Sequence, residues 1–334
     1  MNNSKFKESK LIYDLTTNFP ELFQNRPEDL MSKLEQLKQG LPLENEFIAL
    51  CLWMGKSVLI HKLDQKQMPR ISKDKYQIPD LFLIFEYEGR QIPFLIEIKT
   101  TREPKFVLSQ KYHNKIKNYS NLMGLPLLFA WKIKKIGAWF LLDIDLFKQK
   151  QQAYHVSFEE AFKNNLLCLL VGDYSIHLRK NIKFIIRLKK EELLKEKIKG
   201  PEISQFWKTR IVGANFINYK GEKISKVPRL LFHLLVLARI EDRTEDQGDY
   251  LTQIFEVPES SFLFASNLLG LALIGDLTKY NPKTIDWDKL IHNEAFRISF
   301  AQVKQAVKES MAKGFIQFLG NVLPHVKPKA LVSL

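Results

Sequence analysis

Cysteine is scarce in this sequence, with Cys51 and Cys168 as its only two examples among 334 residues. Each lies in an apolar run, which is typical of a reduced thiol in a core and argues against a disulfide scaffold. The seven histidines are scattered singly, and no Cys/His group has the spacing of a zinc site. Disulfide-stapled and zinc-finger proteins are therefore excluded.

Long apolar segments are also missing. The longest apolar run, residues 262–274, is too short to span a bilayer and contains Ser266 and Asn267. The opening residues, MNNSKFKESK, lead into a polar stretch without the apolar centre of a signal peptide. We therefore expect a cytoplasmic protein with no membrane partner.

Two kinds of catalytic motif are absent as well. The sequence has no GxxxxGK[ST] phosphate loop, which argues against ATP-driven chemistry. No Ser/His/Asp or Cys/His grouping has the context of a nucleophilic site. Metal-dependent enzymes, binding proteins and scaffold proteins remain.

What the sequence has in excess is positive charge. Its 51 Lys and Arg residues against 37 Asp and Glu give a formal net charge of +14. Such an excess indicates a polyanionic partner, either nucleic acid or an anionic membrane face, although it also serves solubility. Residues 102–135 hold eight basic residues and one acid, and residues 176–210 hold eleven and four, so each stretch is net +7. Tyr112, Tyr119 and Trp131 are interleaved with the first stretch, as on a surface that follows a phosphate backbone.

The chain is about twice as long as a typical domain. Changes in hydrophobic periodicity and charge along it predict three regions. Residues 1–40 carry apolar residues at helical spacing and predict an N-terminal helical extension. Residues 41–199 predict an α/β core in which a mixed central sheet is flanked by helices. Residues 200–334 predict a mainly α-helical C-terminal domain that serves recognition, dimerisation or regulation.

Periodicity predicts the individual elements. In the second region the expected helices are residues 44–55 and 108–123. The expected strands there are residues 57–61, 81–87, 93–99, 126–132, 138–144, 166–171, 174–178 and 182–188. A turn at residues 88–90 predicts a hairpin. In the third region we expect a small hairpin at residues 215–224 and helices at residues 227–240, 247–256, 259–273 and 299–313.

The hairpin at residues 79–99 carries charge on otherwise apolar strands. Asp80 follows a proline at the entrance of one strand, and Glu97 and Lys99 lie two apart on the next, so alternation puts them on one face. Buried charges are costly unless they pair or hold a metal. The pattern therefore indicates a Mg²⁺ site of two carboxylates, completed by the carbonyl of Ile98 and by water. Lys99 would orient and activate the attacking water while the cation stabilises charge on a phosphate oxygen.

The Ile-Pro-Asp motif at residues 78–80, followed by a hairpin and the Glu-Ile-Lys motif at residues 97–99, resembles the signature of the PD-(D/E)xK nuclease superfamily. This family has the restriction-endonuclease-like fold, and the match is similar to its Holliday-junction-resolvase-like branch. The resemblance implies that Asp80 and Glu97 are metal ligands and that Lys99 is the catalytic lysine. It also implies Mg²⁺ as the cofactor, with Mn²⁺ as a substitute.

The resemblance covers residues 43–145. It also implies site residues on two helices, one before the first core strand and one after the third strand. Members usually carry an acidic residue on the helix before the first core strand, and Glu46 fits this position as an assistant to the metal or water. Glu44 is a weaker candidate, because residues two apart on a helix point to different sides. Many relatives carry a Gln or Lys on the helix after the third strand, where Gln110 and Lys111 stand.

The basic stretch that directly follows the expected catalytic strand predicts nucleic-acid contacts. The residues expected to contact nucleic acid are Arg102, Lys105, Gln110, Lys111, Lys115 and Lys117.

Each candidate also has an ordinary structural interpretation. Asp80 could cap a turn after proline. Glu97 and Lys99 could form a solvated ion pair on a strand face, and Glu46 could simply be an acid in a first helical turn. The polar residues of the following helix could lie on an exposed face without any site role.

The motif and the charge together predict a Mg²⁺-dependent endodeoxyribonuclease that hydrolyses phosphodiester bonds. DNA is favoured and RNA is not excluded, and restriction, phage defence, mobile-element processing and junction resolution are all compatible settings. Two alternatives remain open: a catalytically inactive nucleic-acid-binding protein of the same fold, and a basic interaction or scaffold protein. Cutting both strands with one site per chain would require two copies, so a homodimer or a partner protein of a larger system is compatible.

Overall fold

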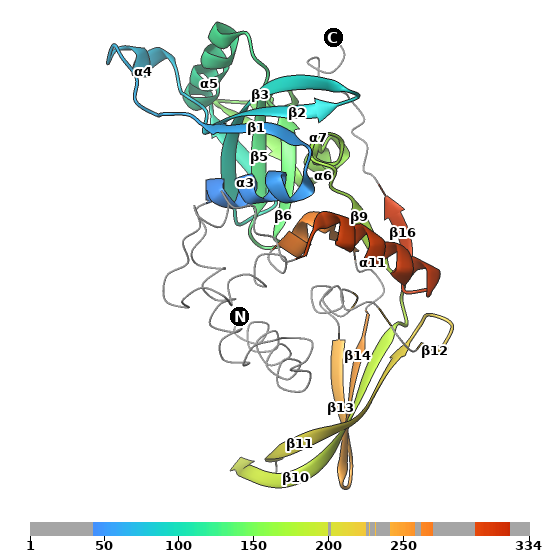
Figure 1. Ribbon diagram of the computed structural model, residues 1–334. Coiled ribbons are helices and arrows are strands. Elements are labelled where there is room, and N and C mark those ends of the chain that lie inside the picture. The colour runs from blue at the N-terminus through green and yellow to red at the C-terminus, as the bar shows by residue number, and fades with distance from the viewer. Residues whose placement is uncertain are drawn as a thin grey trace.

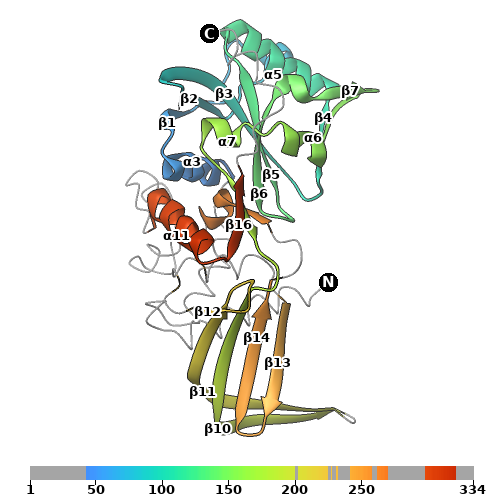
Figure 2. The same ribbon diagram turned by 90° about the vertical axis from the view of Figure 1, so that its right-hand side faces the viewer.

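The structure, a computed structural model, describes most of the chain after residue 42 (Figures 1 and 2). The described residues are 43–199, 202–224, 227, 231, 241–257, 262–269 and 298–320. The helical extension expected at residues 1–40 lies outside them, as does nearly all of the helix expected at residues 227–240.

A five-stranded mixed sheet forms the centre of the first part of the described chain (Figure 1). In spatial order its strands are β1 (Ser57–Lys62), β2 (Leu81–Tyr87), β3 (Arg90–Thr101), β5 (Leu127–Ile133) and β6 (Ala138–Asp143). β3 and β5 run parallel, and every other neighbouring pair is antiparallel. The predicted mixed sheet and these strands are confirmed.

The turn between β2 and β3 fixes the register of the central hairpin. Glu88 and Gly89 have φ values of 51° and 75°, and the flanking residues pair directly, which is the geometry of a two-residue type I′ turn. This register places Leu81 opposite Ile96. The residue that precedes β2, Asp80, therefore reaches the level of β3 at which the motif at residues 97–99 begins.

Both faces of the central sheet are buried, because alternate residues of its strands enter two separate cores. One core packs the apolar helix α3 (Leu43–Met54) against Ile96 and Ile98 of β3. The other core includes Leu95 of β3 and Ile116 of the helix α5 (Gln110–Met123). The chain reaches α5 from β3 through β4 (Lys105–Ser109) and then returns to the sheet as β5, so α5 belongs to the crossover between two parallel strands.

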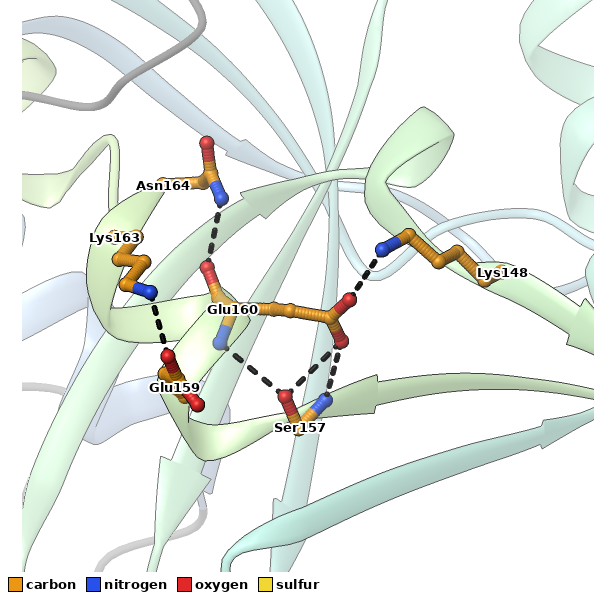
Figure 3. Close-up of polar contacts among 6 residues, drawn as sticks. All are labelled: Lys148, Ser157, Glu159, Glu160, Lys163 and Asn164. Atoms are coloured by element: carbon orange, nitrogen blue, oxygen red, sulfur yellow. Dashed lines mark hydrogen bonds and ion pairs between the residues drawn. The ribbon is translucent and has the colours of Figure 1, made fainter.

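A three-stranded sheet of β4, β7 and β8 supports this crossover. Its two other strands are β7 (Lys148–Lys150) and β8 (Ala153–Ser157). In the chain, the 3-10 helix η1 (Ile144–Leu146) precedes β7, and the helix α6 (Phe158–Lys163) follows β8. A capping box starts α6: the Ser157 hydroxyl accepts from the Glu160 backbone N–H, and the Glu160 carboxylate accepts from the Ser157 N–H (Figure 3). Lys148 donates to the same carboxylate, and this hydrogen bond is the main reason that the pKa of Glu160 falls to about 2.

One strand expected in this region is wrong. Residues 166–171 form no strand, and the short helix α7 (Leu167–Leu170) occupies most of them. A continuous apolar run of this length has no periodicity that separates a buried strand from a buried helix. The Asn165 side chain accepts from the backbone N–H of Leu167, which favours a helical start at this point.

The mainly α-helical C-terminal region is also wrong for the part of the chain that the structure describes, because strands predominate there. An antiparallel sheet contains, in spatial order, β12 (Lys223–Ile224), β11 (Glu202–Ile217), β10 (Lys183–Lys199), β14 (Tyr250–Glu256) and β13 (Glu241–Gln247). A smaller sheet contains β15 (Phe262–Phe264), β9 (Ser175–Leu178) and β16 (Ile316–Gly320). The remaining described elements are the 3-10 helix η2 (Ala265–Leu268) and the helix α11 (Phe300–Ala312).

Turn chemistry explains the failed helix predictions. Gly248, at φ 67°, lies in the tight turn between β13 and β14, and so a hairpin replaces the helix expected at residues 247–256. The described part of the helix expected at residues 259–273 is a short strand and a 3-10 turn. The helix expected at residues 299–313 and the pairing within residues 215–224 are confirmed.

The charged segment at residues 189–199 forms the outer half of β10. β10 and β11 pair on either side of residue 200, and the division of the chain into three regions stays a prediction. Among the described helices, none has the length and apolar content needed to cross a membrane.

Candidate active site

The structure brings together three of the residues that the sequence assigns to a catalytic site. Glu97 and Lys99 lie on the α5 side of β3, and the Lys99 ammonium donates to Glu97 Oε1. Asp80 approaches from the start of β2, where its Oδ2 accepts from the backbone N–H of Ile98 at 2.7 Å. Glu97 is only 1% exposed, so this carboxylate is not part of a solvated surface ion pair.

Tyr112, on the first turn of α5, completes the surroundings of Glu97. Its hydroxyl donates to the same Oε1 that accepts from Lys99. The Lys99 ammonium also lies 5.2 Å from the centroid of the Tyr112 ring. Sequence reasoning missed this role and placed Tyr112 among aromatic residues of a nucleic-acid surface. The signal that could have found it is its place on the helix that covers the face of β3 carrying Glu97.

The second oxygen of Glu97 has a different environment. Oε2 is buried, and the structure gives it no hydrogen-bond partner. Burial and, after it, the charge of Asp80 raise the pKa of Glu97 to about 7. Burial also raises the pKa of Asp80, against the opposing effects of the Ile98 hydrogen bond and the Lys99 charge. Two carboxyl groups in this arrangement do not both ionise readily unless a cation joins them.

The donor set fits a hard divalent cation. Mg²⁺ is typically held by one or two carboxylates together with water and substrate phosphate oxygens. Asp80 and Glu97 supply the carboxylates, and the buried Glu97 Oε2 is an acceptor that a cation would satisfy. In the described part of the chain no group of three or more His, Cys, Asp or Glu side chains is placed to hold a metal. Water and phosphate would therefore complete the coordination, and the ligand role of the Ile98 carbonyl stays a prediction.

Glu46, which the resemblance places in the site, has a different partner in the structure. It pairs with Lys132 of β5 and also accepts from Trp139 Nε1 at 3.2 Å. Lys132 pairs in register with Thr100, one residue after Lys99, and so its side chain leaves the sheet on the opposite face from Lys99. The carboxylate of Glu46 thus neutralises a half-buried lysine on the α3 side of the sheet.

Glu44 of α3 has a minor electrostatic effect on Asp80. Its charge adds to the effect of burial in raising the pKa of Asp80. It occupies the first turn of α3, two residues before Glu46. Which of the two glutamates assists the site stays a prediction, because helical spacing shows that they diverge but not which of them faces the site.

Two of the lysines expected to contact nucleic acid make contacts within the fold. Lys117 forms an ion pair with Asp145 at 2.7 Å. The Lys115 ammonium donates at 2.6 Å to the backbone carbonyl of Lys73, in the short helix α4 (Ser72–Lys75). These contacts dock the β1–β2 connection and η1 onto α5.

The other predicted contact residues lie nearer to solvent. Arg102, Lys105 and Lys111 are exposed, and Gln110 is half-buried. Gln110 begins α5, where its backbone N–H donates to the carbonyl of Gln152 at 3.1 Å. Arg102 and Lys105 lie just after β3 and at the start of β4, so positive charge follows directly on the strand that carries Glu97.

Comparison with known proteins gives little beyond this geometry. No protein-family model and no curated protein matches the chain. Among solved structures, Hjc from Archaeoglobus fulgidus, a Holliday junction resolvase, is similar over 36% of this chain and 88% of that chain. The identity is 13% and the TM-score is 0.29. A likeness of this size carries no weight for function, which therefore rests on the side chains of this chain.

Proposed function

We propose that this protein is a divalent-metal-dependent nuclease that hydrolyses phosphodiester bonds in DNA. The observation that carries the proposal is the buried carboxylate of Glu97, which meets Lys99 and Tyr112 through one oxygen and has no partner at the other. An uncompensated acceptor of this kind is costly in a core and is typical of a site awaiting a ligand.

Each residue has a distinct role in this proposal. Asp80 and Glu97 would hold Mg²⁺, with Mn²⁺ as a substitute, and the bound ion would stabilise negative charge on the attacked phosphate. Lys99 would orient the attacking water and hold its developing hydroxide by charge. Tyr112 fixes the rotamer of the Glu97 carboxylate, and the Ile98 N–H fixes that of Asp80.

Positive charge next to the site supports DNA as the substrate. Arg102, Lys105 and Lys111 are exposed on the segments that follow β3. Cations at these positions would neutralise phosphates on either side of the bond to be cut. RNA would meet the same charges, so parallel assays on both polymers decide between them, and restriction, phage defence, mobile-element processing and junction resolution remain compatible settings.

The direct test is cleavage of duplex, single-stranded and branched DNA with Mg²⁺ or Mn²⁺ by the full chain. Asp80→Ala and Lys99→Ala are each expected to reduce the rate by about 100-fold or more, because charge stabilisation and water activation each contribute at that scale. Glu86→Gln, an exposed acid on β2, is the matched control and should leave the rate unchanged. Retained cleavage in either alanine variant would refute the site.

A second readout separates a nuclease from an inactive relative. Mn²⁺ binding to the wild type, followed by calorimetry, should be lost in Asp80→Ala and kept in Glu86→Gln. A folded wild type that binds DNA but cleaves no substrate with either metal would favour the nucleic-acid-binding alternative. Absence of salt-sensitive binding to DNA, together with a protein contact that resists high salt, would favour a scaffold protein.

A further inference from the structure

The hairpin of β10 and β11 extends well beyond the sheet to which it belongs. The two strands pair from Lys183 with Ile217 out to Lys199 with Glu202, whereas β14 pairs with β10 only as far as Lys189. Beyond Lys189 the hairpin is therefore two-stranded. The name ribbon is used below for residues 189–199 and 202–210, which include the last pair, Lys189 and Arg210, that still lies in the sheet. Figures 1 and 2 show the ribbon projecting from the end of the molecule opposite α5.

Two register shifts determine which charged side chains share a face of this ribbon. They fall between Lys190 and Glu192 and between Leu193 and Lys195. Each shift adds one residue to β10, and so residues three apart in sequence return to the same face of the ribbon. The residues on this face, called the basic face below, are Lys189, Glu192, Lys195, Phe206, Lys208 and Arg210.

The basic face has four cations and two acids, because the bulged residue Glu191 also reaches it and forms an ion pair with Arg210 at 2.8 Å. It is open to solvent. The side chains of Lys208 and Arg210 are each 61% exposed, and Phe206 is 49% exposed. Glu192 approaches Lys208 at 3.7 Å, a distance too long for a firm hydrogen bond. The face thus presents net positive charge around a single exposed aromatic ring.

The opposite face of the ribbon mixes apolar and polar side chains. Leu193 pairs in register with Trp207, and the Lys190 ammonium lies 5.0 Å from the Trp207 ring centroid. Lys190 also forms an ion pair with Asp246 of β13 at 2.7 Å. β13 itself carries four acids and one arginine and lies at the other edge of the sheet. A polyanion would be repelled from that edge and drawn to the ribbon.

We propose that the basic face of the ribbon binds the phosphate backbone of double-stranded DNA, as a second contact region remote from the candidate active site. A two-stranded β-ribbon has the width to enter a major groove about 12 Å across. In that position Lys195, Lys208 and Arg210 neutralise phosphates, and Phe206 contacts the sugar or base edges. The choice of DNA rests on the proposed function, whereas the phosphate contact rests on the ribbon itself.

The test compares two variants of equal charge. The ribbon variant carries Lys195→Gln, Lys208→Gln and Arg210→Gln. The control variant removes the same charge from exposed lysines of β7, α6 and α11, at Lys150, Lys163 and Lys308. Binding to a duplex of about 40 base pairs is measured by fluorescence anisotropy in EDTA, where cleavage is blocked, between 50 and 200 mM salt.

Loss of three phosphate contacts reduces the slope of log affinity against log salt by about 2.7, so the wild type should lose about 40-fold more affinity over this range than the ribbon variant. The control variant should keep most of the wild-type slope. A ribbon variant with the wild-type slope would overturn the proposal. So would an unchanged slope together with a changed sedimentation coefficient, which would make the ribbon a contact between copies of the chain.

The outcome is independent of catalysis. If the ribbon variant binds weakly while no form of the protein cleaves DNA, the ribbon proposal stands and the nuclease proposal fails. If cleavage is intact and the two triple variants bind alike, the nuclease proposal stands and the ribbon proposal fails. Circular dichroism of the ribbon variant shows whether the hairpin is still folded, and Phe206→Ala, which keeps all charges, should weaken binding without changing the salt slope.

Discussion

Replacement of Glu97 by glutamine should stabilise the metal-free protein at alkaline pH while abolishing its activity. The pKa of Glu97 is raised from 4.5 to about 7. A carboxyl with a raised pKa contributes stability that is present below pH 4.5 and is lost as the pH rises through 7. Above pH 7 the full shift corresponds to about 3 kcal/mol of lost stability. Glutamine has nearly the same shape and carries no charge, so it avoids this loss.

The assay is urea-induced unfolding in EDTA. Glu97→Gln should exceed the wild type in free energy of unfolding by about 1 kcal/mol at pH 5 and by about 3 kcal/mol at pH 8. Glu86→Gln, the exposed control, should match the wild type at both pH values. Mn²⁺ at ten times its dissociation constant should stabilise the wild type by about 1.4 kcal/mol and leave Glu97→Gln unchanged. A Glu97→Gln variant that is no more stable than the wild type at pH 8 would refute the reasoning.

Three further substitutions test the surroundings of the site and the fold. Tyr112→Phe should reduce cleavage about ten-fold and move the pH profile to higher pH, because it removes a hydrogen bond to the ionised carboxylate; Tyr119→Phe on the same helix is the control. Glu44→Gln should weaken Mn²⁺ affinity about ten-fold by calorimetry, and a larger effect from Glu46→Gln would contradict this expectation. Ser157→Ala should cost about 1 kcal/mol in urea unfolding through loss of the α6 cap, with cleavage unchanged.

The central hairpin could be predicted from sequence because its determinants are local. The turn at Glu88 and Gly89 and the alternation along residues 93–99 fix which side chains share a face. The proximity of Asp80 and Glu97 then follows from a register that a two-residue turn leaves little freedom to change. The partners of Glu46 and Tyr112 depend instead on how the helices α3 and α5 pack on opposite faces of the sheet. No local pattern in a single sequence predicts that packing.

The C-terminal sheet escaped prediction for a different reason. Alternation is the sequence signal of a strand, and the two register shifts in β10 interrupt it within the charged segment. Lys189, Glu192 and Lys195 are spaced by three, which is closer to a helical repeat than to a strand. The strand is instead specified by its partner, since Trp207 and Lys208 pair with it in a register that no local pattern contains.

The fold determines how many cations of each basic stretch are available to bind phosphate. In residues 102–135 three lysines, Lys115, Lys117 and Lys132, are engaged within the fold, so the local excess available to a phosphate backbone is smaller than the sequence count. In the ribbon the bulges gather on one face four cations that are scattered along the sequence, and Glu191 and Glu192 offset part of their charge. A polyanion that contacts only the basic residues within 102–135, next to the candidate active site, would therefore be bound weakly. A long duplex that also reaches the ribbon gains a second group of phosphate contacts, and each additional contact steepens the salt dependence of binding. Cleavage should therefore be more sensitive to salt on long duplexes than on short ones that cannot reach the ribbon.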